Sequence, residues 1–316
     1  MYSKIDNNEQ TLVDSDSIKK PDTLSVIVIA ICSATYLDRC IDALKRQTGV
    51  NEFEIIVVYD KRLEDIPLLN RKFPDVMMYT IKNMSTPEEL ATLGIRKAGG
   101  DIIALTEDHC IPEEDWCSNI LKAHESPYAA VGGAINCVTE NKIDWAFAFC
   151  DYYRYLTPVP EGKSLYLTVC NVAYKRRALE KVVRAWGDKF HEVTVNNALL
   201  NEGETLWLSQ KLMVKQNRKV SFFNALRERY SFGWLFGSTR AVSIDPQLRL
   251  LYFVAAPAIP FVLMSRMWKN IVLRRTSFAI FIRAFPAIFS FTIAITFGEF
   301  LGNIAGRIPS EVYVAR

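Results

Sequence analysis

Residues 102–116 read IIALTEDHCIPEEDW, and this stretch decides the fold. It opens with an apolar run of the kind expected for a strand that is buried on both faces. The run ends at Glu107, Asp108 and His109, three side chains that can bind a metal ion. In open α/β sheets the ligand site lies just outside the carboxyl ends of the strands. Divalent cations that accompany phosphates favour one or two carboxylates. The stretch therefore indicates an α/β protein that handles a nucleotide diphosphate.

The preceding part of the chain repeats the strand pattern. Residues 24–30 (LSVIVIA) and 53–59 (FEIIVVY) are apolar runs, and residues 36–47 between them carry apolar side chains at helical spacing. This β-α-β order implies a right-handed crossover and a parallel pair of strands. We therefore predict a Rossmann-like, mostly parallel sheet, with Asp60 and residues 107–109 at the same edge. The expected elements, in chain order, are residues 24–30, 36–47, 53–59, 76–81, 86–98 and 102–105.

The composition limits the alternatives. The chain has 316 residues, of which 50% are hydrophobic and 12% aromatic, enough for a sizeable core and for two domains or one large domain with an appendage. The net charge of +3 is too small to indicate nucleic acid as a partner. The seven cysteines lack zinc-ligand spacing, so we expect free thiols in a reducing compartment. Residues 1–22 are polar, show no secretory signal and are predicted to be disordered.

Two long apolar blocks follow residue 245, at residues 250–267 and 278–297. Each approaches the roughly 20 residues that cross a bilayer, so we expect membrane association rather than a pair of buried core helices. The basic connector between the blocks favours a re-entrant hairpin over two full spans, because basic loops stay in the cytoplasm. The predicted boundaries are a polar tail at 1–22, a catalytic domain at 23–220, an amphipathic linker helix at 221–247, two hydrophobic helices or a hairpin at 248–306, and a tail at 307–316.

Two common phosphate-binding motifs are absent from the sequence. After Ala30 the chain reads ICSATYLDR, without the glycines of a dinucleotide-binding turn. No GxxxxGK[ST] phosphate loop occurs either. A bound diphosphate would therefore need another counter-charge, and a divalent cation is the most direct one.

Residues 24 to about 215 resemble the inverting family 2 glycosyltransferases, which have the GT-A fold. The opening strand, loop and helix, LSVIVIAICSATYLDRCIDALKRQ, are similar to that family over their whole length. The paired-Asp strand end of the family corresponds to Tyr59-Asp60, and its DxD motif to Glu107-Asp108-His109. The segments NVAYKR at 171–176 and GETLWLSQKL at 203–212 resemble its acceptor-side element and the element that carries its catalytic base.

The resemblance implies roles for individual residues. A divalent cation, Mn²⁺ or Mg²⁺, is expected at His109 and Glu107. The general base is expected to be Glu204, at the start of a helix that continues through residue 212, with Glu202 as the near substitute. Thr205 stands where the family usually has the Asp. Donor contacts are expected at Ala30, Asp60, Glu107 and Asp108. Acceptor-side contacts are expected at Asn171, Arg176 and His191.

The hydrophobic C-terminal part is similar to that of family members attached to membranes. The expected function is transfer of a sugar from a UDP- or GDP-sugar to a lipid-linked or glycan acceptor in polysaccharide biosynthesis, with the catalytic domain on the cytoplasmic side of the cell membrane. The alternative is a non-catalytic relative that serves as a scaffold or regulatory subunit of a polysaccharide assembly. Tyr59, His109 and Thr205 favour that alternative, whereas the acidic groups at Asp60, Glu107 and Glu204 argue against it.

Overall fold

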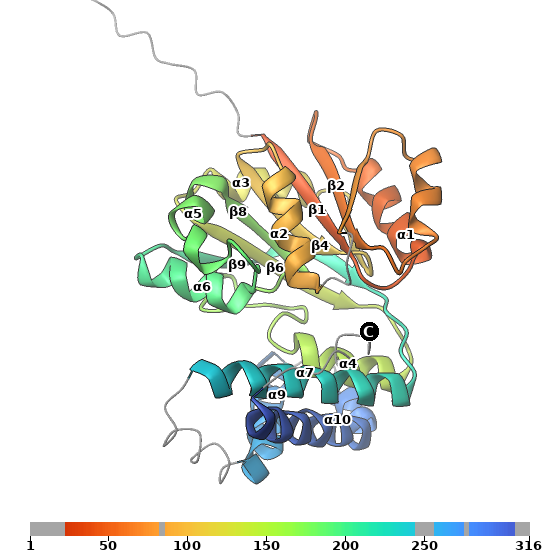
Figure 1. The fold of residues 1–316 in the computed structure, drawn as a ribbon, viewed down its shortest axis with the longest axis vertical. Helices are drawn as coiled ribbons and strands as arrows, with labels where there is room; N and C mark the ends of the chain where they lie inside the picture. Colours follow the sequence, from red (N-terminus) through yellow and green to blue (C-terminus); the bar gives the residue numbers. More distant parts are fainter. Residues whose placement is uncertain (1–22, 82–85, 244–255, 275–277, 307–316) are drawn as a thin grey trace, which may run out of the picture.

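The computed structural model describes residues 23–81, 86–243, 256–274 and 278–306. The tails predicted at residues 1–22 and 307–316 and the start of the first hydrophobic block lie outside the described residues. The described chain forms two layers (Figure 1): an α/β layer built on one sheet, and a layer of helices beneath one edge of that sheet.

The sheet has the predicted parallel strands in its first half and, in addition, antiparallel pairings in its second half. Its first four strands are mutually parallel, and β8 is then inserted antiparallel between β4 and β6. The last long strand, β9, runs parallel to β6, and the short strands β5 and β7 pair with it in antiparallel fashion. In spatial order the strands are β3 (Met77–Ile81), β2 (Glu54–Asp60), β1 (Leu24–Ala30), β4 (Ile102–Glu107), β8 (Asn171–Lys175), β6 (Ala130–Cys137), β9 (Leu206–Gln216) and β5 (Cys110–Pro112), with β7 (Gly162–Lys163) beside β9.

The helix that starts at Pro87 has a side-chain cap, whereas the other described α-helices of the α/β layer begin without one. The hydroxyl of Thr86 accepts a hydrogen bond from the amide of Glu89 while the Glu89 carboxylate accepts one from the amide of Thr86, a capping box. The helices of this layer are α1 (Ala34–Lys45), α2 (Pro87–Lys97), α3 (Trp116–His124), α5 (Arg176–Lys181) and α6 (Glu192–Asn201), with short 3₁₀ turns at Ile66–Arg71 and Val183–Ala185.

Strand direction divides the sheet into two edges. Strands β1, β2, β4, β6 and β9 all end at one edge, which we call the carboxyl edge. Helices α2 and α6 start near this edge and run back to the opposite, amino edge, where β4 and β9 begin. The carboxyl edge faces the helical layer (Figure 1), so any site at the strand ends is enclosed between the two layers.

The helix predicted over residues 203–212 is wrong. Residues Leu206–Gln216 form the strand β9, in which Leu206, Leu208, Leu212 and Val214 are buried. The spacing of these residues is two except across Ser209 to Lys211, where the pairing with β6 shifts register. The prediction of a helix rests on the resemblance of this segment to a family element, and not on its own spacing, which is that of a strand with one irregularity.

The helical layer consists of α4 (Lys142–Tyr152), α7 (Phe222–Ser243), α9 (Ile259–Arg274) and α10 (Phe278–Ala305), with a 3₁₀ turn at Ala256–Ala258. Glycines allow α7 and α10 to approach closely. A Cβ atom on Gly233 of α7 would collide with the carbonyl of Ile295 on α10, and one on Gly298 of α10 would collide with the carbonyl of Tyr230 on α7. Gly237 and Gly302 continue the contact one turn further along each helix.

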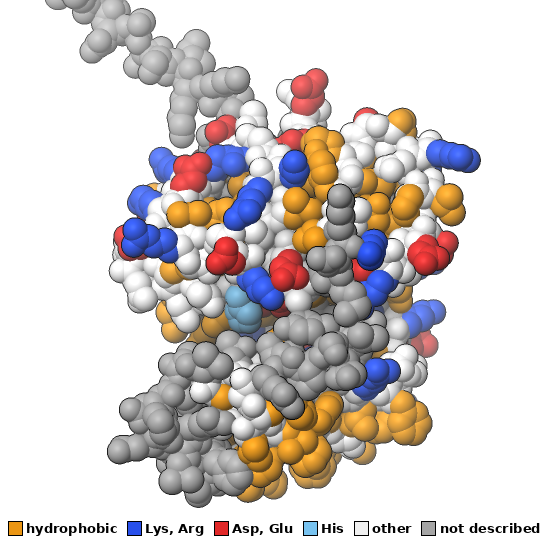
Figure 2. All heavy atoms as spheres, in the orientation of Figure 1, with side chains coloured by type: hydrophobic (Ala, Val, Ile, Leu, Met, Phe, Trp, Pro, Cys, Tyr) orange, Lys and Arg blue, Asp and Glu red, His pale blue; other side chains and the backbone are white. Residues whose placement is uncertain are grey.

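The outer face of this layer is apolar, as Figure 2 shows at the bottom of the molecule. Helix α10 has 28 residues, and an 18-residue stretch of it has a mean hydropathy of 2.0, so it is long and apolar enough to cross a membrane. A third of that stretch is buried inside the protein. Helix α9 has 16 residues, fewer than the roughly 20 that a span needs. The exposed apolar side chains of this layer include Phe223, Phe232, Phe236, Phe261, Trp268, Phe278, Ile282, Phe285, Ile293 and Phe297.

Candidate active site

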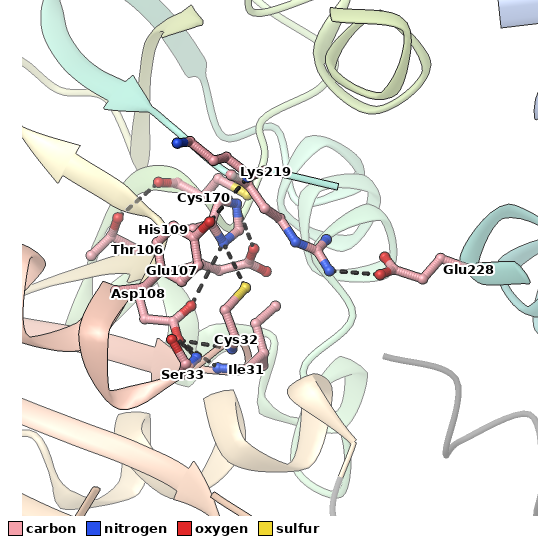
Figure 3. A network of polar contacts seen from close by, with 12 residues as sticks. Ile31, Cys32, Ser33, Thr106, Glu107, Asp108, His109, Cys170, Lys219 and Glu228 are labelled. Carbon is pink, nitrogen blue, oxygen red and sulfur yellow. Dashed lines mark hydrogen bonds and ion pairs between the residues drawn. The ribbon is translucent and has the colours of Figure 1, made fainter. Parts of the chain in front are cut away.

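Asp108, directly after β4, holds the loop between β1 and α1. Its Oδ2 atom accepts hydrogen bonds from the backbone amides of Ile31, Cys32 and Ser33 at 3.2, 2.8 and 3.2 Å (Figure 3). These amides lie at the start of α1, where Ser33 is the N-cap. The side chain is fully buried. Asp108 therefore occupies the place that an external anion takes at other helix N-termini, and it acts as a positioning group for the loop.

Glu107 and His109 direct two ligand atoms toward one point. The Oε2 atom of Glu107 lies 3.5 Å from Nε2 of His109, which is also 3.2 Å from the hydroxyl of Tyr152 on α4. His109 is 1% exposed and Glu107 is 7% exposed, so the carboxylate is the more open of the two. Two ligands that are each about 2.1 Å from an ion lie roughly 3 Å apart when they meet at a right angle. The pair therefore fits one divalent cation after a small adjustment.

Asp60, at the end of β2, is engaged by a neighbouring arginine. Arg62 donates from Nε to Oδ1 at 2.9 Å and from Nη2 to Oδ2 at 3.0 Å, a bidentate pair. Ala30 lies at the adjacent end of β1 and is fully buried. Ala30, Asp60, Glu107 and Asp108 are thus brought to one edge; that they contact a donor stays a prediction.

Glu192, which the sequence did not single out as a site residue, also lies at the carboxyl edge. It is the first residue of α6, preceded by the N-cap His191. Burial raises the pKa of the Glu192 carboxyl, the charge of His191 lowers it in part, and the charges of Glu88 and Glu107 add to the increase. Glu192 therefore lies within electrostatic reach of Glu107, and its raised pKa makes it a better proton acceptor than a solvent-exposed carboxylate.

Arg218 supplies the positive charge of this edge. It follows β9, and the preceding residue, Asn217, donates an amide hydrogen bond to the carbonyl of His109 at 3.4 Å. The Arg218 guanidinium donates to Glu228 on α7 at 2.7 Å. Burial alone would lower the pKa of Arg218, but Cys32, Glu228 and Tyr152 raise it. Its proximity to these groups places a permanently charged cation beside the Asp108 loop and His109.

The two carboxylates predicted as general base lie elsewhere. Glu204 precedes β9 at the amino edge, where the carbonyl of Thr205 accepts a hydrogen bond from Ala129, the residue before β6. Its carboxylate pairs with Lys181 of α5. Glu202 is the exposed C-cap of α6. Because Glu107 lies at the opposite edge of the sheet, the predicted role of Glu204 or Glu202 as the base is incompatible with the fold.

The predicted acceptor-side residues have different positions. Asn171 is completely buried, donates to backbone carbonyls of β6 and β9, and accepts a hydrogen bond from the indole of Trp116 at 2.9 Å. Arg176 lies at the amino edge, where it donates to carbonyls of the turn before β4 at 2.7 Å. Both residues stabilise the fold. Asn171 pairs with Thr106 near the end of β4 and so lies at the carboxyl edge, as does His191 beside Glu192.

Comparisons with known proteins agree with this architecture. The model of the family described as "Glycosyl transferase family 2" matches residues 25–183, about half of the chain. No curated protein matches the chain. Among solved structures, the chain is similar to the mannosyltransferase PcManGT from Pyrobaculum calidifontis in complex with GDP-Man and Mn²⁺, with a TM-score of 0.57, 16% identity, and coverage of 90% of this chain and 88% of that one. The chain therefore belongs to glycosyl transferase family 2, and its α/β layer has the GT-A fold.

Proposed function

We propose that the protein is an inverting glycosyltransferase that moves a sugar from a nucleotide diphosphate to a hydroxyl group of an acceptor at a membrane surface. The observation that carries this proposal is the pairing of Glu107 with His109 at the carboxyl edge, 3.5 Å apart, with Arg218 following the hydrogen bond from Asn217 to His109 and with the charge of Glu107 raising the pKa of Glu192. A proton acceptor, a metal-capable carboxylate and a fixed cation are the groups that such a transfer requires.

In the proposed reaction Glu192 accepts the proton of the acceptor hydroxyl. The hydroxyl oxygen forms a bond to the anomeric carbon while the bond from that carbon to the diphosphate oxygen breaks, which inverts the configuration. The electron pair of the broken bond leaves with the diphosphate, where negative charge develops. Arg218 stabilises that charge through charge-assisted hydrogen bonds that are strengthened by the enclosed surroundings.

Glu107 and His109 would hold a divalent cation, which supplies Lewis-acid stabilisation of the departing diphosphate. The imidazole favours Mn²⁺ over Mg²⁺, since Mg²⁺ prefers oxygen ligands. The Mn²⁺ and GDP-Man present in the similar mannosyltransferase support a metal and a nucleotide-sugar donor for this chain as well. Asp60, held by Arg62, is proposed to contact the nucleobase.

The apolar face of the helical layer supports a position at a membrane. A monomeric soluble protein rarely exposes so large a continuous apolar surface. We propose that α9 and α10 attach the enzyme to the cell membrane with the catalytic layer in the cytoplasm, and that the acceptor is a lipid-linked glycan.

Purified protein in nanodiscs, mixed with UDP- and GDP-sugars and with Mn²⁺, Mg²⁺ or EDTA, tests the proposal. Nucleotide release that requires the metal is the expected result. In Glu192→Gln the release is expected to fall while donor binding persists. Folded protein that binds no nucleotide would instead favour the non-catalytic scaffold.

A further inference from the structure

A cavity of about 200 Å³ lies between the end of β6, the helix α4 and the helix α9. An apolar cavity of about 150 Å³ can hold a benzene-sized molecule, so this one has room for part of a hydrocarbon chain. Its walls are mainly aromatic and aliphatic, with Asn136, Thr157 and Asn270 as polar exceptions. The apolar lining includes Ile135, Trp145, Phe149, Tyr153, Leu156 and Ile271.

The cavity lies between the catalytic edge and the apolar surface of the molecule. On one side Tyr153 follows Tyr152, whose hydroxyl lies 3.2 Å from Nε2 of His109. On the other side Ile271 belongs to α9, a helix that also exposes Phe261 and Trp268 on the outer face. A chain that enters from the membrane face would therefore end close to the proposed site.

One guanidinium group contacts Tyr153, a residue of the cavity wall, and the charge of a second one acts on the same tyrosine. The guanidinium carbon of Arg154 is 4.6 Å from the centre of the Tyr153 ring and 4.8 Å from that of Tyr166. Burial raises the pKa of Tyr153, and the charges of Arg154 and Arg266 lower it in part. Within the described part of the chain neither arginine forms an ion pair with a carboxylate. The cavity therefore combines an apolar interior with cations that are available to an anion.

Arg154 and the proposed base Glu192 both act on one neighbouring side chain, Tyr155. Burial raises the pKa of Tyr155, Arg154 lowers it in part and Glu192 adds to the increase. The charges of Arg154 and Glu192 therefore both act on Tyr155, the residue before Leu156 in the wall of the cavity. An anionic group at Arg154 would place the next part of the same molecule at the catalytic carboxylate.

We propose that the cavity binds the hydrocarbon chain of a lipid-linked acceptor, next to a phosphate that is held by Arg154 and Arg266. The sugar hydroxyl beyond that phosphate then faces Glu192. This inference rests on the proposed function, because it assigns the acceptor of the same reaction. It commits to the acceptor lipid rather than to a bilayer phospholipid, because the cavity is walled by the catalytic sheet on one side.

Dodecyl phosphate with a diazirine at the middle of its chain is a probe that needs no turnover. Irradiated with the protein in phosphatidylcholine nanodiscs, it is expected to label peptides of α4 and α9 in a saturable manner. Arg154→Gln removes a cation and is expected to raise the half-saturating probe concentration about tenfold, the loss of roughly one charge-assisted contact. Asn270→Phe fills the cavity and is expected to raise the same concentration at least as much. Matched controls are Val272→Phe on the exposed side of α9 and Arg177→Gln on α5, which should label as wild type.

Three results would overturn the assignment. They are equal labelling by dodecyl trimethylammonium with the same diazirine, unchanged saturation in Asn270→Phe, and loss of labelling in nanodiscs that contain phosphatidylglycerol, which would identify a structural phospholipid site. Calorimetric binding of UDP- and GDP-sugars to the same samples separates the two proposals. Donor binding without labelling contradicts the lipid site alone, and labelling without donor binding contradicts the proposed transferase.

Discussion

Arg218, at the end of β9, donates a hydrogen bond of 2.7 Å to Glu228 on α7. Both side chains are largely buried, with 13% and 8% of their surfaces exposed. Because β9 belongs to the α/β layer and α7 to the helical layer, this ion pair joins the two. It also fixes the guanidinium beside Cys32 and Tyr152, with further N–H donors left for a ligand.

Replacement of Arg218 is expected to weaken donor binding. Arg218→Lys keeps a charge but loses the planar fork, and we expect about tenfold weaker binding of the nucleotide diphosphate, measured by calorimetry. The double variant Arg218→Gln/Glu228→Gln removes both buried charges, so it should fold and bind more weakly still. Arg184→Gln, on the exposed surface, is the control. Unchanged affinity in the double variant would exclude Arg218 from the diphosphate site.

Glu192→Gln is expected to lower kcat by a factor of about 10² to 10⁴, the usual contribution of a general base. Donor affinity is expected to change little. Glu204→Gln and Glu202→Gln should match the wild type, because both lie away from the carboxyl edge. If Glu204→Gln instead loses activity while Glu192→Gln keeps it, the assignment of the base is reversed.

The pH dependence follows from the raised pKa of Glu192. The base must be deprotonated, so activity is present above this pKa and is lost as the pH falls through it. We expect the acid limb of the kcat profile to lie above 4.5, the ordinary value for Glu. The residual activity of Glu192→Gln should lack this limb. A wild-type limb at or below the ordinary value would contradict the raised pKa of the Glu192 carboxyl.

Metal binding is expected to require Glu107 and His109. Titration of Mn²⁺ followed by electron paramagnetic resonance should show one tight site in the presence of a nucleoside diphosphate. That site is expected to weaken at least tenfold in Glu107→Gln and in His109→Ala, about 1.4 kcal/mol or more. Glu113→Gln, at the exposed Lys215 pair, is a matched carboxylate control. Full Mn²⁺ affinity in both site variants would place the ion elsewhere.

The glycine contact between α7 and α10 can be tested through stability. Gly302→Val places a side chain against the carbonyl of Trp234, and overpacking of this kind costs about 1–3 kcal/mol. We expect a lower thermal midpoint in detergent. Ile304→Val, on the exposed face of the same helix, should leave the midpoint unchanged. Equal midpoints for the two variants would show that the helices separate readily.

The parallel half of the sheet could be predicted from sequence because its strands are uninterrupted apolar runs. Leu24–Ala30 and Ile102–Glu107 are buried along their whole length, so burial and pattern coincide. The antiparallel insertion of β8 has no comparable signature. It decides which residues of the second half lie at which edge, and therefore that Arg176 and Glu204 lie far from Glu107.

The cluster at residues 107–109 could be located in the sequence, but the separate roles of Glu107, Asp108 and His109 could not be predicted from it. Asp108 is enclosed by backbone amides of the β1–α1 loop, a contact between segments distant in sequence. Glu192 carried one local signal, an acidic residue in the first turn of a helix that ends before Gly203. The same signal usually marks an ordinary helix start. It identifies Glu192 as a candidate base only once the structure brings its carboxyl within electrostatic reach of Glu107.

The glycine-lined seam between α7 and α10 has a consequence for protein engineering. Removal of α10 to obtain a water-soluble enzyme would expose Gly233 and Gly237 to solvent. It would also deprive α7, the helix that carries Glu228, of its main packing partner. A solubilised variant must therefore retain both helices as one unit. Its polar substitutions belong on the outer face, at positions such as Phe261 and Phe297, whose side chains are exposed.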